Sequence, residues 1–469
     1  MSIEISGFLV PVAILIVILL WKLLRNPSFH PRTLPLPPGP KPLPILGNVL
    51  NIPSSLPWVT YADWSAKYGD VMHLQLLGQS IIVLGSPEAA FELLEKRSAI
   101  YSDRPRSTLV SLMGWDWNFA LMPYGPRWRP TRRTFWQHFH PGVISKYEQT
   151  QLHETRRFLR KLLASPDQLT HHIHYAFGAT ILKAVHGIEV ADSDDKYVSL
   201  LKQAAQGPAK AFVPGAFWVE YMPILRHIPA WVPGAGFQKK IAKWRADSIA
   251  LNEVPFQVAK SAFTFSTLHA FFLAMILYPD VQKKAQAELD NLVGATRLPD
   301  FGDRPSLIYI NAIVKECLRW QNVAPLGVFH RSVADNEYKG YLIPEGSVAF
   351  LHDPKVYSMP EEFMPERFIK DGKLNSDIRD PSTIAFGYGR RICPGRNFAE
   401  SSLFINIATV LHVFDIIPAV GANGETIPVE ARMTSGFLSY PVEFTYSIAP
   451  RSVAAEGLIR KTSQTKDRA

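Results

Sequence analysis

The chain has 469 residues, of which 47% are hydrophobic and 19% charged, so it can bury a large core and is not intrinsically disordered. Its net charge is +9, but the basic residues are scattered, which favours an acidic protein partner, an anionic membrane surface or a plainly solvated surface over nucleic acid. Only two cysteines occur, Cys317 and Cys393, which excludes a disulfide framework and a cysteine-rich zinc site.

The N-terminal 24 residues predict a single-pass membrane anchor. Residues 5–21 carry no charge, and this length is at the short end for a helix that spans a bilayer. A cleaved signal peptide is the alternative, but it would need a basic start and a small-residue cleavage site, whereas here Glu4 precedes the run and Lys22 and Arg25 follow it. We therefore expect an uncleaved anchor, with the rest of the chain on the cytoplasmic side.

Residues 25–48 are expected to form a proline-rich hinge. They contain the run Leu34-Pro-Leu-Pro-Pro-Gly-Pro-Lys-Pro-Leu-Pro44. Because proline fixes φ and removes a hydrogen-bond donor, this run predicts a stiff extended spacer that holds a globular domain at a set angle to the bilayer. A proline-rich ligand for a recognition module is the alternative.

Residues 49–450 predict one domain that is mostly helical with small β-sheets, of the α+β class. Helical periodicity and capping predict helices over 86–95, 268–277, 279–292 and 307–320. The strand-like runs are short, at 71–77, 80–84 and 346–351. Two stretches rich in large apolar residues, 109–122 and 212–237, predict either core or a pocket or membrane-dipping surface. The polar residues 451–469 predict a disordered tail.

The segment 385–400 carries the chemistry. Gly387 and Gly389 allow a tight backbone path, and a helical pattern begins at Asn397, so Cys393 should lie in a loop just before a helix N-terminus. The partial positive charge there stabilises a thiolate, which can ligate a metal. Three arginines add positive charge nearby: Arg390, Arg391 and Arg396. A dinucleotide loop is a weaker interpretation, because the third glycine and a preceding strand are missing.

This segment resembles the haem-binding loop of the cytochromes P-450, and Phe386, Gly389, Arg391, Cys393 and Gly395 stand at its signature positions. The resemblance covers nearly the whole chain and is closest to fungal, basidiomycete members of secondary metabolism. It implies the cytochrome P-450 fold, haem b as cofactor and Cys393 as the axial ligand of the haem iron. The resemblance also implies that electrons come from NADPH through a reductase, with cytochrome b5 as a further partner, and that the protein does not bind nucleic acid. It further implies that the protein lies in the endoplasmic reticulum membrane.

Two companion motifs resemble a charged network of the family. Glu316-x-x-Arg319 has the i,i+3 spacing that places both side chains on one face of a helix. Alone, the pair could be a surface salt bridge. In the family a third residue completes the network, and Arg367 in Pro365-Glu-Arg-Phe368 stands at its position.

Further motif matches imply contacts to the haem propionates. Trp128-Arg-x-x-Arg132 matches a family motif in which the Trp and the second Arg bind a propionate, and Arg391 has the same role. His330 occupies the position of another such contact. Cations here make physical sense, since two carboxylates that enter a core need partners. Four residues are candidates for an apolar pocket lining: Leu326, Gly327, Val328 and Phe437.

The chain departs from the family in its oxygen-activating helix. The family carries an acid followed by Thr, where this chain has Ala262 and Phe263, so Thr264 is the remaining candidate for a catalytic hydroxyl. Relative to the family, stretches are missing between Val254 and Lys260 and again within 346–354.

Two main hypotheses follow. The first is a haem-thiolate monooxygenase that oxidises an apolar small molecule of fungal secondary metabolism, with terpenoids as the first guess and aromatic or indole-derived compounds as the second. The second is a haem-binding variant that is defective in oxygen activation, because the hydroxyl and acid that relay protons are lost. A membrane-anchored interaction protein without haem is a third and weaker hypothesis.

Overall fold

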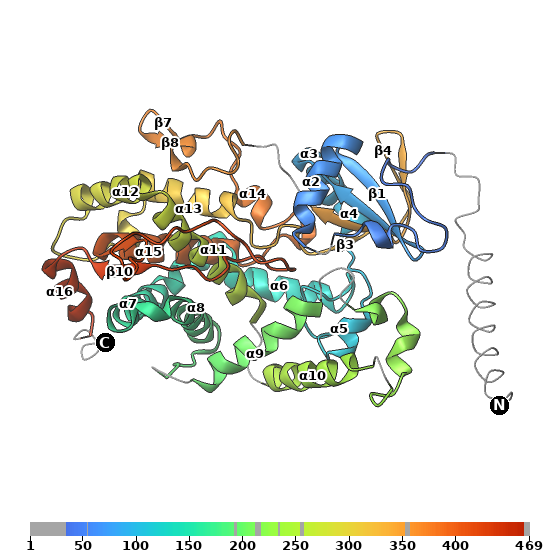
Figure 1. Ribbon diagram of the computed structural model, residues 1–469, viewed down its shortest axis with the longest axis horizontal. Helices are drawn as coiled ribbons and strands as arrows, with labels where there is room; N and C mark the ends of the chain where they lie inside the picture. Colours follow the sequence, from blue (N-terminus) through green and yellow to red (C-terminus); the bar gives the residue numbers. More distant parts are fainter. Residues whose placement is uncertain are drawn as a thin grey trace.

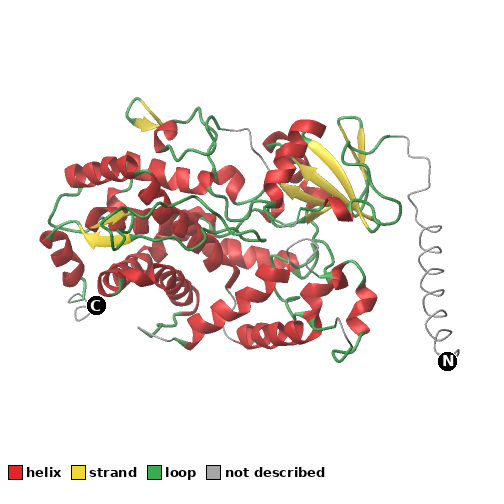
Figure 2. Cartoon of the chain, in the orientation of Figure 1, coloured by secondary structure: helices red, strands yellow, loops and turns green. Residues whose placement is uncertain are grey.

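The computed structural model describes residues 34–53, 55–191, 195–211, 217–232, 235–253, 258–351 and 357–463. The predicted anchor, residues 1–24, and the first part of the hinge lie outside the described residues. Most strands gather at one end of the molecule, two small strand pairs lie in other parts of it, and helices make up most of the rest (Figure 1, Figure 2). The predicted α+β class, mostly helix with small sheets, is confirmed.

Most described residues belong to helices. The α-helices are α2 (Pro57–Tyr68), α3 (Pro87–Ala90), α4 (Ser98–Tyr101), α5 (Thr108–Leu112), α6 (Trp128–Phe139), α7 (Glu148–Ala164), α8 (Leu169–His186), α9 (Lys196–Ala211), α10 (Phe237–Glu253), α11 (Val258–Leu277), α12 (Pro279–Leu292), α13 (Ile308–Trp320), α14 (Ser382–Ala385), α15 (Arg396–Val413) and α16 (Val453–Lys461). Short 3₁₀ turns include η6 (Trp218–Glu220), η7 (Pro223–His227), η9 (Pro365–Phe368) and η10 (Gly389–Arg391), and η3 (Phe91–Lys96) is a π-helix. The predicted helix over 86–95 is therefore divided between α3 and η3.

The main sheet has four strands in the order β1-β2-β6-β3, where β1 is Val71–Leu76, β2 is Gln79–Leu84, β3 is His330–Arg331 and β6 is Val348–Leu351. β1 and β2 form an antiparallel hairpin, whose two turn residues, Leu77 and Gly78, both have positive φ, as tight hairpin turns require. β6 runs parallel to β2 and antiparallel to β3. The sheet thereby fixes the backbone of His330, which is paired with Ala349.

Three two-stranded sheets complete the β structure. They pair β4 (Asn336–Tyr338) with β5 (Tyr341–Ile343), β7 (Ile369–Lys370) with β8 (Lys373–Leu374), and β9 (Phe414–Ile417) with β10 (Ser447–Pro450). All three pairs are antiparallel.

The main core lies around α11 and α15. Phe271, Phe272 and Leu273 of α11 are at most 1% exposed, and α11 packs against α8, α13 and α15. α15 is buried on nearly all its faces from Phe398 to Val413, as expected of a helix at the centre of a large core. These two helices bring Thr264 of α11 and the residues just before α15 to one cavity.

The predicted disorder of residues 451–469 is wrong for residues 453–461, which form α16. The Ser452 side chain caps this helix by accepting a hydrogen bond from Ala455 N. Ala455, Leu458 and Ile459 are buried, and their i, i+3, i+4 spacing gives the helix an apolar stripe that outweighs its polar composition.

Of the two apolar stretches, 109–122 contributes to both core and cavity. Leu109, Met113 and Trp115 are buried in one hydrophobic cluster, while Trp117 and Phe119 line the cavity described below. In the second stretch, several described side chains are exposed: Trp218, Met222, Ile224 and Trp231.

Among the described residues, no single helix has the length and apolar character to cross a membrane. Residues 264–277 and 279–292 meet those criteria only as a pair, and this pair is bent by 104°.

Candidate active site

A cavity of about 650 Å³ is lined on one side by residues of α2 and β2 and on the other by residues of α6, α11, α13 and α15. It collects most of the predicted site residues, from four separate parts of the chain. Those that line it are Trp128, Arg132, Thr264, His330, Phe386, Arg391, Cys393 and Gly395, together with Arg319 of the predicted charged network. Of the predicted pocket residues, Gly327 and Val328 line it, whereas Leu326 is buried in the cluster next to the sheet and the Phe437 ring packs edge-on against Phe329.

Cys393 lies in a loop between α14 and α15. Its backbone N–H donates to the Phe386 carbonyl at 2.8 Å, which closes the loop, and Gly395 is the N-cap of α15. The thiol is thus close to the N-terminus of an 18-residue helix. The prediction that Cys393 precedes a helix N-terminus is confirmed.

Gly389 allows this loop to approach its neighbour closely. Its φ is +58°, and a Cβ atom there would lie 2.2 Å from the carbonyl oxygen of Leu94. Any side chain would therefore force the loop away from η3, which is the physical reason for glycine at this position.

Arg391 is buried along one wall of the cavity. Its guanidinium donates to the carbonyls of Ser102 at 2.7 Å and Met122 at 2.9 Å, and it stacks over the Trp128 ring at 4.4 Å. Burial, with nearby Arg132, lowers the pKa of Arg391 to about 10, so the group is still charged at neutral pH.

Arg104 is a cavity residue that the sequence did not reveal. It is 5% exposed and donates to the carbonyls of Ala120, Val328 and Phe329. Burial, followed by repulsion from Arg391, holds its pKa well below the usual range. A lone arginine in a loop is usually solvated, so no local pattern could mark it.

His330 is held in a neutral form in this arrangement. Its Nδ1 lies 2.7 Å from the Tyr101 carbonyl, which can only accept, so Nδ1 carries the hydrogen. Burial first, and then Arg104, lowers the pKa of His330 to about 3. In the same wall, Trp128 Nε1 is buried and has no hydrogen-bond partner among the described residues. Burial lowers the pKa of Arg132, and the nearby Cys393 sulfur opposes this.

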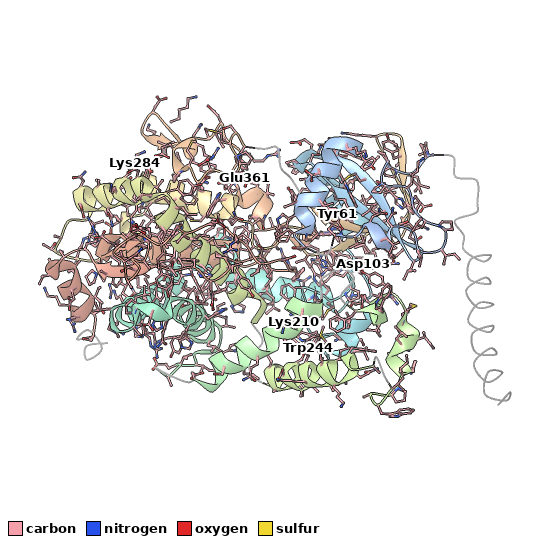
Figure 3. All side chains as sticks on the ribbon, in the orientation of Figure 1. Tyr61, Asp103, Lys210, Trp244, Lys284 and Glu361 are labelled. Atoms are coloured by element: carbon pink, nitrogen blue, oxygen red, sulfur yellow. The ribbon has the colours of Figure 1, made fainter. Side chains whose placement is uncertain are left out.

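The cavity wall therefore carries more positive than negative charge. The carboxylate next to Arg104 and Arg391 is Asp103, which lies where the strand-rich end meets the helical body (Figure 3). Asp103 already accepts from Tyr124 N at 2.9 Å and pairs with Arg331 at 3.2 Å. Buried cations need anionic partners. The arrangement fits an anionic ligand, whose oxygens would also meet the free Trp128 N–H.

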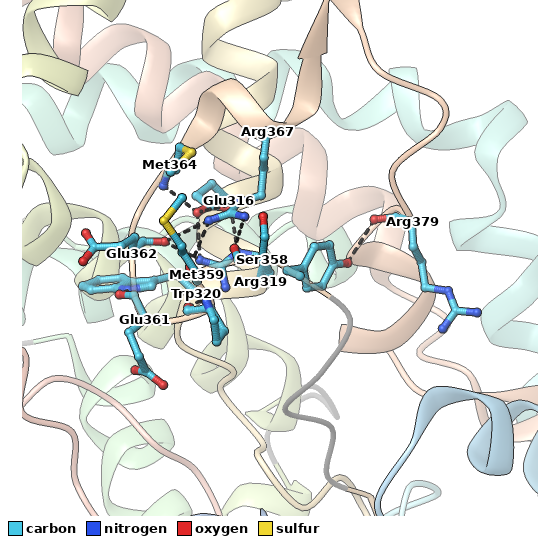
Figure 4. Close-up of polar contacts among 12 residues, drawn as sticks. Glu316, Arg319, Trp320, Ser358, Met359, Glu361, Glu362, Met364, Arg367 and Arg379 are labelled. Carbon is cyan, nitrogen blue, oxygen red and sulfur yellow. Dashed lines mark hydrogen bonds and ion pairs between the residues drawn. The ribbon is translucent and has the colours of Figure 1, made fainter.

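The predicted charged network forms. Glu316 is fully buried, and Arg319 donates to both of its oxygens, at 2.7 and 2.8 Å, while Arg367 Nε donates to one at 3.3 Å (Figure 4). Met364 N also donates to the carboxylate. The two guanidiniums use their other N–H groups on carbonyls of residues 358–362, so the network ties α13 to the segment that leads into η9.

Comparison with known proteins identifies the family. A family model of the cytochromes P-450 matches residues 37–253 and 254–446. A cytochrome P-450 monooxygenase of Coprinopsis cinerea is 39% identical, over 92% of this chain and 92% of its own. One of Armillaria gallica is 39% identical, over 97% and 99%, and the tryptamine 4-monooxygenase of Psilocybe cyanescens is 36% identical, over 89% and 93%.

The chain belongs to the cytochrome P-450 family. It is a cytochrome P-450 monooxygenase, an oxidoreductase whose cofactor is haem with thiolate-ligated iron and whose electrons come from a reductase partner. The donor set fits this cofactor, because haem brings two carboxylates to a wall that has an excess of guanidinium groups and an unpartnered indole N–H.

The comparisons also bear on the missing stretch. The two matched stretches meet between Glu253 and Val254, where the sequence departs from the family. The alignment to the Coprinopsis relative spans 482 residues, more than the 469 of this chain, so the relative has residues that this chain lacks. Thr264, buried on α11, lines the cavity. Neither the fold nor the comparisons support the hypothesis of a defective variant.

Glu316→Ala should destabilise the protein by about 3–5 kcal/mol, because it leaves two buried guanidiniums without their carboxylate. Urea unfolding measures this. Lys370→Ala is the control, because it breaks an exposed pair with Asp377 and should cost less than about 1 kcal/mol. Equal costs for the two variants would contradict a structural role for the network.

Proposed function

We propose that this chain oxidises an apolar small molecule of fungal secondary metabolism in the 650 Å³ cavity, where Cys393 would ligate the haem iron. The observation that carries the proposal is the Cys393 thiol, which faces this cation-walled cavity next to the N-terminus of α15. The other cysteine, Cys317, is 2% exposed within the core, and burial keeps the pKa of its thiol well above the usual range. Cys317 is therefore unsuited to ligation.

Five residues would hold the haem propionates in this proposal: Arg104, Trp128, Arg132, His330 and Arg391. The arginines supply charge, and Trp128 Nε1 supplies a donor that no described residue uses. His330 can join as a donor only by taking up a proton at Nε2, which the approach of an anion would favour. When bound, thiolate-ligated haem supplies the activation of dioxygen, because the thiolate donates electron density to the iron.

Monooxygenation also needs protons, since one atom of dioxygen enters a C–H bond and the other leaves as water. Thr264 is buried and lines the cavity from α11. We propose that its Oγ1 passes protons inward in place of the acid–Thr pair of the family. Phe119, Phe135 and Ile181 line the same cavity and limit the entry of water.

Two hydroxyls suggest what the substrate carries. Ser439 is 2% exposed and lines the cavity, and its carbonyl accepts a hydrogen bond from Ser266 at 2.5 Å, so it lies beside α11. Both hydroxyls belong to buried residues that line the cavity. A polar group of the substrate can bond to them there, which supports an oxygen-bearing terpenoid first and an indole second. The tryptamine 4-monooxygenase among the relatives acts on an indole amine.

We further propose that the chain is held at the endoplasmic reticulum membrane, on its cytoplasmic side, where a reductase and cytochrome b5 supply electrons. The apolar run over 5–21 supports an anchor. Exposed apolar side chains support a second contact: Leu43, Ile45, Leu46, Leu50, Trp218, Met222, Ile224 and Trp231. Val49, Ile52 and Tyr221 of the same two segments pack against one hydrophobic cluster.

Cys393→Ala should abolish the thiolate-type Soret band that the reduced, carbon monoxide-bound wild-type protein shows, because no other described cysteine reaches the cavity. Cys317→Ala is the matched control and should keep the band. A band that survives Cys393→Ala would remove the proposed ligand. Product formation by the wild type that depends on NADPH and reductase then tests turnover.

Ser439→Ala should weaken binding of an oxygenated or N–H-bearing ligand about fivefold, the effect of one neutral hydrogen bond of about 1 kcal/mol. Substrate-induced shifts of the Soret band measure dissociation constants for matched pairs: a sesquiterpene alcohol against its hydrocarbon, and indole against indene. The hydrocarbon and indene should bind the variant and the wild type equally. An equal loss for both members of a pair would contradict the proposed polar contact.

Replacing Ile224 and Trp231 together by Glu should reduce flotation of the full-length chain with anionic lipid vesicles, because two apolar contacts become charged. Val453→Glu is the control, since Val453 is 89% exposed on α16, at the far end of the molecule (Figure 1). Unchanged flotation of the double variant would remove this surface from the proposed membrane contact.

A further inference from the structure

One acidic residue outside the cavity contacts the loop that carries Cys393. The Glu95 carboxylate accepts a hydrogen bond from Gly389 N at 2.5 Å, although the two residues are 294 positions apart. Glu95 itself is exposed on η3 and does not line the cavity.

The other described hydrogen bonds of this loop's backbone are internal. Gly387 N donates to Ile384 O, Ile392 N donates to Gly389 O, and Cys393 N donates to Phe386 O. The Gly389 N–H thus differs from these in having its acceptor on another element. The Gly389 carbonyl in turn accepts a hydrogen bond from Ile392 N. Glu95 is therefore linked through Gly389 to Ile392, the residue next to Cys393.

The π-helix η3 shapes the surface that meets the loop. Its wide turn closes with a bond from Arg97 N to Glu92 O at 3.1 Å, five residues apart. π-helical turns are rare and often occur at functional sites. Here η3 presents two acceptors in succession, because the Leu94 carbonyl lies against Gly389 Cα and the Glu95 carboxylate meets its N–H.

We propose that Glu95 is a positioning residue for the Cys393 loop: its carboxylate fixes Gly389 against η3 and so keeps the sulfur in place to ligate the haem iron. Several contacts then hold the loop. Arg391 holds it from inside through the Ser102 and Met122 carbonyls, α15 holds its C-terminal end, and Glu95 holds its outer turn. This inference rests on the proposed role of Cys393.

The neighbouring Glu92 provides a matched control. It lies on the same π-helix, but its carboxylate pairs with Lys96 at 3.1 Å and Arg97 at 3.2 Å and not with the loop. A general effect of lost negative charge or lost helix propensity on η3 should appear in Glu92→Ala as well as in Glu95→Ala. An effect of the loop contact should appear only in the second.

The test follows the thiolate-type band of the reduced, carbon monoxide-bound protein over time in mild urea, in the full-length haem-loaded chain. Glu95→Ala should lose the band about tenfold faster than the wild type, which corresponds to about 1.4 kcal/mol for a charge-assisted hydrogen bond. Glu95→Gln should lie between the two, because its amide oxygen still accepts but carries no charge. Glu92→Ala should match the wild type.

Far-UV circular dichroism in the same urea separates a local from a global effect. Glu95→Ala should keep the helix signal while it loses the band. The proposal is overturned if Glu95→Ala loses the band at the rate of Glu92→Ala, or if band and helix signal disappear together. Should Glu95→Ala not fold, Glu95→Gln decides by the same two measurements. If the wild type shows no thiolate-type band, the assignment of Cys393 fails together with this inference; if only the Glu95 variants behave like Glu92→Ala, the assignment stands.

Discussion

The excess of buried positive charge along one cavity wall is the constraint on which the site depends. Arg104 and Arg391 satisfy their N–H groups mainly with backbone carbonyls, which provide hydrogen bonds but no compensating charge. Asp103 is shared with Arg331 and Tyr124 N, so it cannot neutralise both. A dianionic ligand offsets the cost of burying these cations, because they then gain charged partners in a medium of low dielectric constant.

The Glu316 network shows the opposite arrangement in the same molecule. There one buried carboxylate meets two guanidiniums and a backbone N–H, with further N–H groups on carbonyls, so its polar atoms are satisfied without any ligand. Compensated charge of this kind fixes the packing of α13 against the following loop. Arginine thus has two uses here. Arg319 and Arg367, which are paired with a carboxylate, stabilise the fold. Arg104 and Arg391, which bond mainly to carbonyls, leave positive charge at the cavity for an anionic ligand.

The parts of the site that could be predicted are those carried by short local motifs, such as the Cys393 loop, the Trp128 and Arg132 pair, and the Glu316 and Arg319 pair. The loop from Phe386 to Gly395 can be recognised in the sequence because glycines and arginines flank Cys393 at short spacing. Its place before a helix follows from the local pattern alone. Arg104, Ser439 and Glu95 gave no such signal, because each reaches the site or the loop only through the tertiary fold. The same reason explains α16, where composition suggested disorder and only the spacing of Ala455, Leu458 and Ile459 indicated a buried stripe.

The helix α11 differs from the family pattern, because Ala262 and Phe263 stand where the family has an acid and a threonine. One residue along a helix rotates a side chain by about 100°, so the hydroxyl of Thr264 cannot occupy the place of a hydroxyl at position 263. It nevertheless faces the cavity, beside the hydroxyl-bearing Ser439 that Ser266 holds against the helix. In the proposed function, the Cys393 loop and the cationic wall hold the haem, and Thr264 of α11 passes the protons, so different elements of the fold serve the two roles.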